Sequence, residues 1–248
     1  MKKIALFIFI VLLSCNDKNN QKPNIVFIMS DDHTSQAWGI YGGILSDYVK
    51  NDGIKRLANN GTVLNNLFCT NSICVPSRAS ILTGKYSHIN GVYNLPDALS
   101  PDSLNIAKIL KENGYQTSII GKWHLKKEPS GFDYYKVLPG QGLYHDPYFK
   151  TVENWEDGYY GGKKEKGFSA DIIGDSSIEW LNNISRDKPF FMMTHFKATH
   201  EPFDYPERHN DLNKDVVFPE PQSLYEFDSN ESGRKHIGQI VENLTERW

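Results

Sequence analysis

The sequence lacks any strong excess of charge. Its 248 residues carry a net charge of -3, from 27 Lys and Arg against 30 Asp and Glu. So small a charge gives no overall attraction to nucleic acid or to an anionic membrane, and we expect no nucleic-acid partner. An anionic substrate would therefore need a locally basic pocket. The hydrophobic share of 39% suits one substantial core or two small domains.

Cysteine is also scarce. The chain has Cys15, Cys69 and Cys74, an odd number that cannot all pair within one chain. A bridge between Cys69 and Cys74 would be feasible, but it would consume the side chain that we consider below as a nucleophile. We therefore predict that Cys69 is a buried structural thiol.

No apolar run is long enough to cross a bilayer, which takes roughly 20 residues. The run at residues 4–13 follows Lys2 and Lys3, and it ends in Leu-Leu-Ser-Cys at Cys15. This pattern resembles the lipobox of bacterial lipoproteins, in which the cysteine is lipidated. We expect a lipoprotein signal peptide at residues 1–15, a polar tether at 16–23, and export to the periplasm or cell surface with a lipid anchor in the membrane. The alternative is a plain secretory signal with an incidental cysteine.

Three apolar runs, at residues 24–29, 116–120 and 189–194, are predicted strands. The first is nearly continuous, which is typical of a strand buried on both faces of a parallel sheet. Helical patterns lie between them: one ends at Gly61, one runs from about 100 to 114, and one spans 168–184 with Ser169 as its cap. This alternation predicts an α/β fold with a mainly parallel sheet flanked by helices. Residues 131–167 show no period, and we predict an extended loop or small irregular insertion there.

A Cys-Val-Pro-Ser-Arg motif occupies residues 74–78. Pro76 suits the first turn of a helix, which would place Cys74 beside free backbone N–H groups at the positive end of the helix dipole. Arg78 adds a cation one turn further on. The motif predicts a nucleophile position that faces an anion, and the alternative is a buried free cysteine near a helix start.

Polar side chains follow each predicted strand. They are Asp31 and Asp32 after the first strand, Lys122 and His124 after the second, and His195, Lys197 and His200 after the third. Ligands of open α/β sheets bind outside the carboxyl ends of the strands, so we expect these residues to gather at one edge. Adjacent carboxylates are ligands of the kind that Ca²⁺ or Mg²⁺ takes. The alternatives are that the two aspartates cap the following turn and that the lysine and histidine form a surface pair.

The motif at 74–78 with the Ala-Ser-Ile-Leu-Thr-Gly that follows it, the Asp-Asp pair, and Gly-Lys-Trp-His at 121–124 together resemble the signatures of type I sulfatases. The resemblance begins at about Asn24 and implies an alkaline-phosphatase-like fold and a sulfuric ester hydrolase that acts on a polysaccharide or oligosaccharide. In that family a maturating enzyme oxidises the motif cysteine to formylglycine (3-oxoalanine). The partners implied are that enzyme and a sulfated glycan, and the cofactor is Ca²⁺, with Mg²⁺ as the alternative.

The resemblance also implies roles for particular residues. Asp31, Asp32 and the modified Cys74 would bind the metal. Lys122 would contact the sulfate and the nucleophile, and His124 would support the hydrated aldehyde. Arg78 and His200 would also surround the sulfate, with His200 protonating the leaving alcohol and His195 as its competitor. Gln141 and His145 would line the substrate mouth, and the alternative for their segment is an ordered surface loop.

Sulfatases continue further than this chain, with another strand ending in Asp-Asn or Asp-His and a later lysine. No aspartate after Glu201 follows an apolar strand or precedes Asn or His. We therefore expect residues 24–248 to be a truncated sulfatase N-terminal domain with an incomplete metal shell and an exposed edge or unpaired face of its sheet. Two other functions stay open: a phospho- or phosphonate ester hydrolase of the same superfamily, and an inactive carbohydrate-binding lipoprotein.

Overall fold

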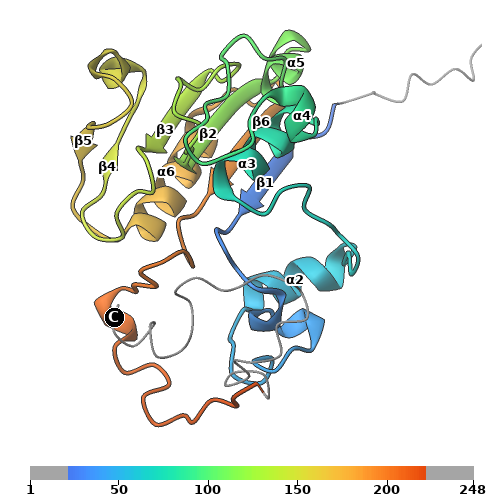
Figure 1. Cartoon of the computed structure of the whole chain (residues 1–248), viewed down its shortest axis with the longest axis vertical. Helices are drawn as coiled ribbons and strands as arrows, with labels where there is room; N and C mark the ends of the chain where they lie inside the picture. Colours follow the sequence, from blue (N-terminus) through green and yellow to red (C-terminus); the bar gives the residue numbers. More distant parts are fainter. Residues whose placement is uncertain (1–21, 222–248) are drawn as a thin grey trace, which may run out of the picture.

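The fold is seen in a computed structural model, which describes residues 22–221 (Figure 1). The predicted signal peptide, Cys15 and most of the predicted tether lie outside the described residues. None of the described helices has the length and apolar character needed to cross a membrane.

A four-stranded sheet forms the centre of the fold, in the order β1-β6-β2-β3. Its strands are β1 (Ile25–Met29), β2 (Gln116–Lys122), β3 (Tyr134–Leu138) and β6 (Phe190–His195), and all three pairings are parallel. His195 is level with Met29 on one side and Gly121 on the other. Three strands therefore end together, and the segments that follow them begin at one edge.

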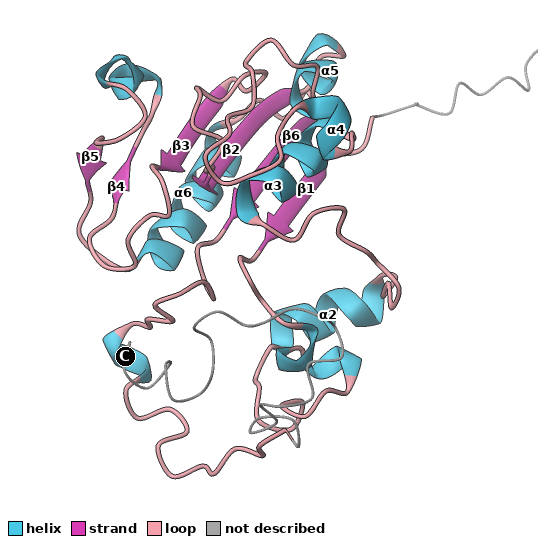
Figure 2. Ribbon diagram, viewed as in Figure 1, coloured by secondary structure: helices cyan, strands magenta, loops and turns pink. Residues whose placement is uncertain are grey.

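Helices cover both faces of this sheet (Figure 2). α3 (Cys74–Thr83), α4 (Ser87–Asn90) and α5 (Ile106–Glu112) lie on one face, and α6 (Ser169–Asn183) lies on the other. Consecutive residues of β2 serve the two layers, because Ile119 packs in the cluster with α3 and α5 while Ile120 packs with Ile173 of α6. The prediction of a mainly parallel sheet flanked by helices is confirmed.

The remaining elements are short. α2 (Asp52–Asn60) is followed by Gly61 as predicted, and it lies beyond the carboxyl edge of the sheet, apart from the two helical layers (Figure 1). The others are η1 (Ser35–Ala37), η2 (Gly39–Tyr41), η3 (Val152–Asp157), η4 (Glu207–His209), and the strand pair β4 (Tyr148–Phe149) and β5 (Lys163–Lys164).

The prediction of an irregular segment at 131–167 is wrong for β3, which is a full member of the central sheet. Val137 and Leu138 of this strand are at most 1% exposed. The polar and aromatic residues that begin β3 hide its apolar signal, since Lys136 lies in the middle of the strand and bonds Glu165 at 2.7 Å. Tertiary contacts here outweigh the weak local pattern.

The first strand is not buried on both faces, contrary to the sequence prediction. Val26 and Ile28 are 47% and 60% exposed, while Ile25 and Phe27 pack against the core cluster. Among the described residues β1 pairs with β6 alone, so it is an edge strand. An apolar side-chain pattern reports the preference for burial, but only the neighbouring layers decide whether both faces are covered.

Two predicted helix starts also differ. α5 begins at Ile106 rather than near residue 100, because the Asn105 side chain accepts a bond from the Lys108 amide at 3.0 Å. α6 begins at Ser169 itself, and Phe168 takes the cap position without a side-chain bond. The Ser169 hydroxyl is buried without a hydrogen-bond partner among the described residues, so the predicted Ser169 cap is wrong.

Candidate active site at the carboxyl edge of the sheet

Helix α3 places Cys74 at the edge of the sheet. The helix begins at Cys74, and its cap residue, Ile73, provides no side-chain bond to the first amides. Pro76 lies in the first turn, as predicted, where a missing N–H costs nothing. Val75 and Ala79 are fully buried and fix the helix on the core, while the Cys74 side chain is half-buried. The thiol is therefore held at a fixed place on a rigid element.

Asp31 follows β1, and its carboxylate pairs with both buried cations of the site. Its carboxylate is 3.3 Å from Nη2 of Arg78 through Oδ1, and its Oδ2 accepts a hydrogen bond from Nζ of Lys122. Burial by itself raises the pKa of Asp31, but the charges of Arg78 and Lys122 outweigh it, so the pKa lies below its usual value. Asp31 is thus an ionised, buried carboxylate. It does not cap the next helical turn, because η1 is capped by Thr34.

Lys122, the last residue of β2, is fully buried, which excludes the surface-pair alternative for it. Its Nζ is 4.0 Å from Sγ of Cys74 and donates to Oε1 of Gln141 at 2.5 Å. Burial lowers the pKa of Lys122, and the carboxylate of Asp31 opposes that effect. One ammonium group thus joins the cysteine, the aspartate and the loop that follows β3.

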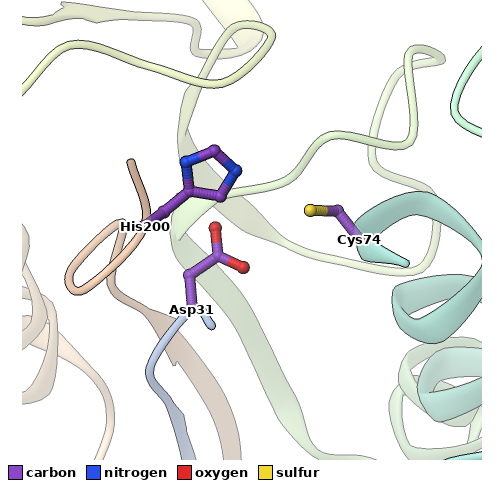
Figure 3. A group of neighbouring side chains, drawn as sticks. All are labelled: Asp31, Cys74 and His200. Atoms are coloured by element: carbon purple, nitrogen blue, oxygen red, sulfur yellow. The ribbon is translucent and has the colours of Figure 1, made fainter. Parts of the chain in front are cut away.

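His200 completes a cluster with Asp31 and Cys74, in which the candidate ligand atoms all lie within 4.8 Å of one another (Figure 3). The three side chains come from the end of β1, the start of α3 and the segment after β6. Nε2 of His200 is 3.6 Å from Oδ2 of Asp32. Asp32 is exposed at a φ of 50°, a left-handed conformation that turns the chain directly after Asp31.

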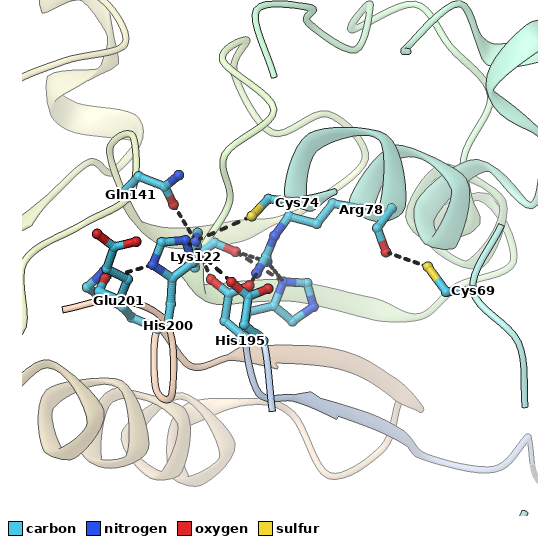
Figure 4. A network of polar contacts seen from close by, with 12 residues as sticks. Cys69, Cys74, Arg78, Lys122, Gln141, His195, His200 and Glu201 are labelled. Carbon is cyan, nitrogen blue, oxygen red and sulfur yellow. Dashed lines mark hydrogen bonds and ion pairs between the residues drawn. The ribbon is translucent and has the colours of Figure 1, made fainter. Parts of the chain in front are cut away.

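His195, the competitor of His200, is not a member of this cluster, although it belongs to the same network of polar contacts (Figure 4). Its Nδ1 is 3.2 Å from Nη1 of Arg78 and 3.2 Å from the carbonyl oxygen of Lys122. Burial, together with the charge of Arg78, lowers the pKa of His195 to about 3, so this ring is neutral at pH 7. The geometry favours His195 as a support for Arg78 and His200 as the histidine that faces the cysteine.

The other predicted site residues, His124, Gln141 and His145, differ in how deeply they are buried. His124 is 7% exposed, and burial followed by the charge of Lys122 lowers its pKa to about 4. Nδ1 of His124 has no hydrogen-bond partner among the described residues. His145 is half-exposed, with Nε2 3.1 Å from Oδ2 of Asp204. Gln141 lies deeper, against Lys122, whereas His145 is at the surface.

Cys69 is exposed, so the prediction that it is a buried thiol is wrong. Its Sγ is 3.0 Å from the carbonyl oxygen of Asn71 and 3.7 Å from Oγ of Ser77. Both Cys69 and Cys74 are free thiols. They line one cavity of about 630 Å³ together with Asp31, Asp32 and Arg78. A larger cavity of about 920 Å³ lies beside α2, but its lining has no Lys, Arg, Asp or Glu, so we place the chemistry in the smaller one.

Sequence reasoning passed over two residues next to the cluster. Lys197 was visible after the third apolar run but received no role, and the structure buries it to 2% exposure. Tyr144 was part of the predicted mouth segment, and its hydroxyl bonds the backbone of His200 at 2.5 Å. A lysine so close to a predicted histidine was the available signal for the first. Nothing local pointed to the second, because its partner is 56 residues away.

Comparison with known proteins places this chain in a family. The sequence profile of the Sulfatase family matches residues 23–231, most of the chain. The chain belongs to the sulfatase family. Among characterised relatives, an N-acetylglucosamine-6-O-sulfatase of Bacteroides thetaiotaomicron is 41% identical over 247 residues, covering 96% of this chain. An ulvan-active sulfatase of Formosa agariphila is 32% identical over 231 residues, covering 86%.

Solved structures agree on the fold. A protein solved in complex with its substrate D-glucosamine-2-N,6-O-disulfate superposes with a TM-score of 0.77 at 41% identity and covers 83% of this chain. A sulfatase from Pseudoalteromonas sp. superposes with a TM-score of 0.59 at 24% identity, which bears on the fold alone. The alkaline-phosphatase-like sulfatase fold expected from the resemblance is thereby confirmed.

The chain spans less than half the length of these relatives. It covers 42% of the Bacteroides enzyme, 44% of the Formosa enzyme and 40% of the protein solved with the glucosamine disulfate. Family and fold therefore describe this chain, while catalysis and substrate are matters of proposal.

Proposed function

We propose that this chain carries the nucleophile and anion-binding residues of a glycan sulfatase, a sulfuric ester hydrolase that removes sulfate from a polysaccharide or oligosaccharide. One observation carries the proposal: Asp31, Cys74 and His200 converge within 4.8 Å, and the ammonium of Lys122 is 4.0 Å from the cysteine sulfur. A carboxylate, a nucleophile position, an imidazole and a buried cation are the parts that sulfate-ester hydrolysis needs.

The cysteine by itself is a weak nucleophile here. Burial raises the pKa of Cys74, and the opposing charge of Lys122 does not cancel that effect, so the thiol is protonated at pH 7. We infer that a maturating enzyme oxidises Cys74 to formylglycine. The hydrated aldehyde would supply one hydroxyl as the nucleophile: as this hydroxyl loses its proton and bonds to sulfur, the ester S–O bond would break and the alcohol would leave. Loss of the proton of the second hydroxyl would then restore the aldehyde C=O as the C–O bond to sulfate breaks.

Lys122 and Arg78 supply the electrostatic part. The ammonium of Lys122 is adjacent to the nucleophile position, and the guanidinium of Arg78 is fixed by Asp31 at 3.3 Å and by the carbonyl oxygen of Lys122 at 2.7 Å. Both cations are almost fully buried, so they need no rearrangement as charge moves onto the departing groups. In this proposal His124 hydrogen-bonds the hydrated aldehyde, and His200 protonates the leaving alcohol.

The acidic residues fit a hard divalent cation in kind. Asp31 and Asp32 are consecutive, and Asp31 shares its neighbourhood with Cys74, whose oxidised form adds oxygen donors. We propose that Asp31, Asp32 and the oxygens at position 74 hold Ca²⁺, with Mg²⁺ as the alternative. A bound cation would offset the sulfate charge and acidify the nearby hydroxyl. Lys122 now bonds Oδ2 of Asp31, so it would yield that oxygen on binding.

The substrate proposal rests on the relatives. Their names describe an N-acetylglucosamine-6-O-sulfatase and an ulvan-active sulfatase, and the solved neighbour holds a sulfated glucosamine. We propose a sulfated sugar as substrate, with N-acetylglucosamine 6-sulfate as the first to test. Gln141 and His145 would then meet the sugar beyond the sulfate.

The test combines mass and activity after co-expression with a maturating enzyme. Oxidation of Cys74 to the aldehyde lowers the mass of its peptide by about 18 Da, whereas ordinary thiol oxidation adds oxygen. Cys69 lies on the same tryptic peptide and provides the internal control, since it should remain an alkylatable thiol. Only unmodified Cys74 in this peptide would sink the formylglycine assignment.

Activity is measured on the sulfate and phosphate esters of one phenol and on N-acetylglucosamine 6-sulfate. Hydrolysis of the sulfate esters should need Cys74 and fall on addition of a chelator, while Cys69→Ala should retain it. Preferential hydrolysis of the phosphate ester would support a phosphoester hydrolase instead. Sulfated-glycan binding without turnover in the oxidised protein would indicate a binding protein.

We also propose that the protein is an exported lipoprotein anchored through Cys15. The motivation is the Leu-Leu-Ser-Cys sequence after a short apolar run. Cys15→Ala should move the protein from the membrane fraction to the soluble fraction, because an acyl chain contributes about 0.8 kcal/mol for each buried CH₂. Membrane association that survives this substitution would contradict lipidation.

A further inference from the structure

The segment that carries His200 is tied down by a tyrosine from the loop after β3. The Oη of Tyr144 donates to the carbonyl oxygen of His200 at 2.5 Å. Tyr144 is 4% exposed, and burial raises its pKa to about 12. Its hydroxyl is therefore a permanent donor across the neutral and alkaline range, and the bond it makes does not come and go with pH.

Tyr144 is in turn seated by the start of α6. Its ring stacks on Phe168, with centroids 5.6 Å apart and an interplanar angle of 19°. Its carbonyl oxygen accepts from the amide of Ser169 at 2.7 Å. The tyrosine is thus held at both its ring and its backbone. Because it also bonds the backbone of His200, it fixes the His200 segment relative to α6.

Lys197 contacts both Tyr144 and the residue after His200. Its Nζ lies 4.8 Å from the ring centroid of Tyr144 and donates to the carbonyl oxygen of Glu201 at 3.2 Å. Lys197 is 2% exposed, and burial followed by the charge of Lys122 lowers its pKa to about 8. A buried ammonium against an aromatic face is held more firmly than one in water. The side chain therefore links Tyr144 to the residue that follows His200.

These contacts decide which nitrogen of His200 carries hydrogen. Nδ1 is 2.7 Å from the carbonyl oxygen of Glu201, and because a carbonyl only accepts, Nδ1 must donate. Nε2 faces Asp32, at 3.6 Å, on the side of the reaction centre, and it carries the second proton of the imidazolium when His200 acts as an acid. The carbonyl of Glu201 is common to His200 and Lys197, so a shift of either contact disturbs the ring.

We propose that Tyr144 and Lys197 are positioning residues for His200, which hold residues 197–201 so that Nε2 of this histidine is presented to the sulfate ester. The inference rests on the proposed function, in which His200 protonates the leaving alcohol. Neither residue needs to touch the substrate. Their effect should appear only where correct placement of that imidazole matters.

The proposed role of His200 can be tested by comparing substrates whose leaving groups differ in their need for a proton. A sugar alkoxide needs a proton as it departs, whereas 4-nitrophenolate leaves as a stable anion. His200→Ala should cost about 10²–10⁴ in kcat with N-acetylglucosamine 6-sulfate and far less with 4-nitrophenyl sulfate. Tyr144→Phe and Lys197→Met should follow the same direction, with a loss about tenfold larger on the sugar sulfate and KM little changed.

Tyr135→Phe is the matched control. Tyr135 is also buried, and its hydroxyl also makes a 2.5 Å bond, but to Glu128. Any general loss of stability from removing such a hydroxyl should affect both substrates equally in this variant. If Tyr144→Phe and Lys197→Met likewise lose equally on both substrates, the positioning role is refuted.

A second measurement does not depend on catalytic activity. Nitrogen-15 NMR of the imidazoles should show that Nδ1 of His200 keeps its hydrogen in the unsubstituted chain while Nε2 is the nitrogen that gains and loses the proton, and that the neutral ring is a mixture of tautomers in Tyr144→Phe. If His200→Ala shows no leaving-group dependence, the proposed acid role of His200 fails, and the tautomer comparison alone decides the positioning. An unchanged tautomer of His200 in both Tyr144→Phe and Lys197→Met would overturn the inference.

Discussion

At the scale of the residue, His195 is a histidine whose chemistry is determined by burial. It is 3% exposed and lies against Arg78 and the Lys122 carbonyl. An imidazolium there would face a guanidinium without access to water, so the neutral ring is strongly preferred. The ring of His195 in the folded protein is therefore neutral across the physiological range.

This neutral ring predicts acid sensitivity. The folded pKa of His195 is about 3, below the usual 6.5, so the unfolded chain binds the proton first as the pH falls. The contribution is complete above pH 6.5 and is lost progressively towards pH 3, by up to about 1.4 kcal/mol per pH unit. Chemical unfolding at several pH values should show that slope, and His195→Asn should reduce it. His209→Asn, at an exposed histidine, is the matched control for the loss of a histidine as such.

At the scale of the element, the end of β2 leaves no room for a side chain against β6, at the point where the site begins. Gly121 is level with His195 at a φ of 105°. A Cβ on Gly121 would lie 1.9 Å from the carbonyl oxygen of His195. The residue must be glycine for β2 to deliver Lys122 directly beyond this contact, which gives a structural reason for the Gly-Lys-Trp-His order.

Gly121→Ala should therefore be severely destabilising, by more than about 3 kcal/mol, because both the strand contact and the positive φ are incompatible with a side chain. Gly174→Ala is the matched control. Gly174 lies within α6, and a Cβ there meets nothing within 4 Å. That substitution should stabilise the protein by about 0.5–1 kcal/mol. Thermal unfolding of the two variants checks both signs, and a mild effect at Gly121 would contradict the close approach.

At the scale of the whole molecule, the sheet is covered unevenly. The helices α3, α4 and α5 cover one face, but the outer part of the opposite face leaves Val26 and Ile28 of β1 exposed. An edge strand with exposed apolar side chains invites pairing with another chain. This surface is the feature most apt to govern how the protein behaves at high concentration.

Replacing both residues with threonine, as Val26→Thr with Ile28→Thr, should lower light scattering at high protein concentration. Threonine keeps the branched shape that favours a strand while reducing the apolar surface, so the melting temperature should change little. Ile89→Thr is the control, since Ile89 is 59% exposed but belongs to helix α4 and not to a strand. Equal effects from the two replacements would show that general hydrophobicity, and not the strand edge, drives association.

Much of the candidate site was predictable because its residues adjoin strong local signals. Asp31 and Lys122 follow apolar runs at the same edge of a parallel sheet, and Cys74 starts a helix marked by Pro76. Strand ends and helix starts are local properties, so side chains attached to them can be placed from the order of elements alone. β3 could not be predicted in this way, since its pattern is mixed and its burial depends on β2 and α6.

By itself, the sequence determined the α/β alternation, the sheet edge where the chemistry gathers, and the residue types available there, because these follow from periodicity and from residues adjacent in the chain. The tertiary structure alone decided that His200 rather than His195 faces Cys74, that Cys69 is exposed, and that Tyr144 bonds the His200 backbone. Such outcomes depend on register and on the paths of loops between distant segments. Side chains separated by many residues meet only where packing brings their elements together, and no local pattern encodes that meeting.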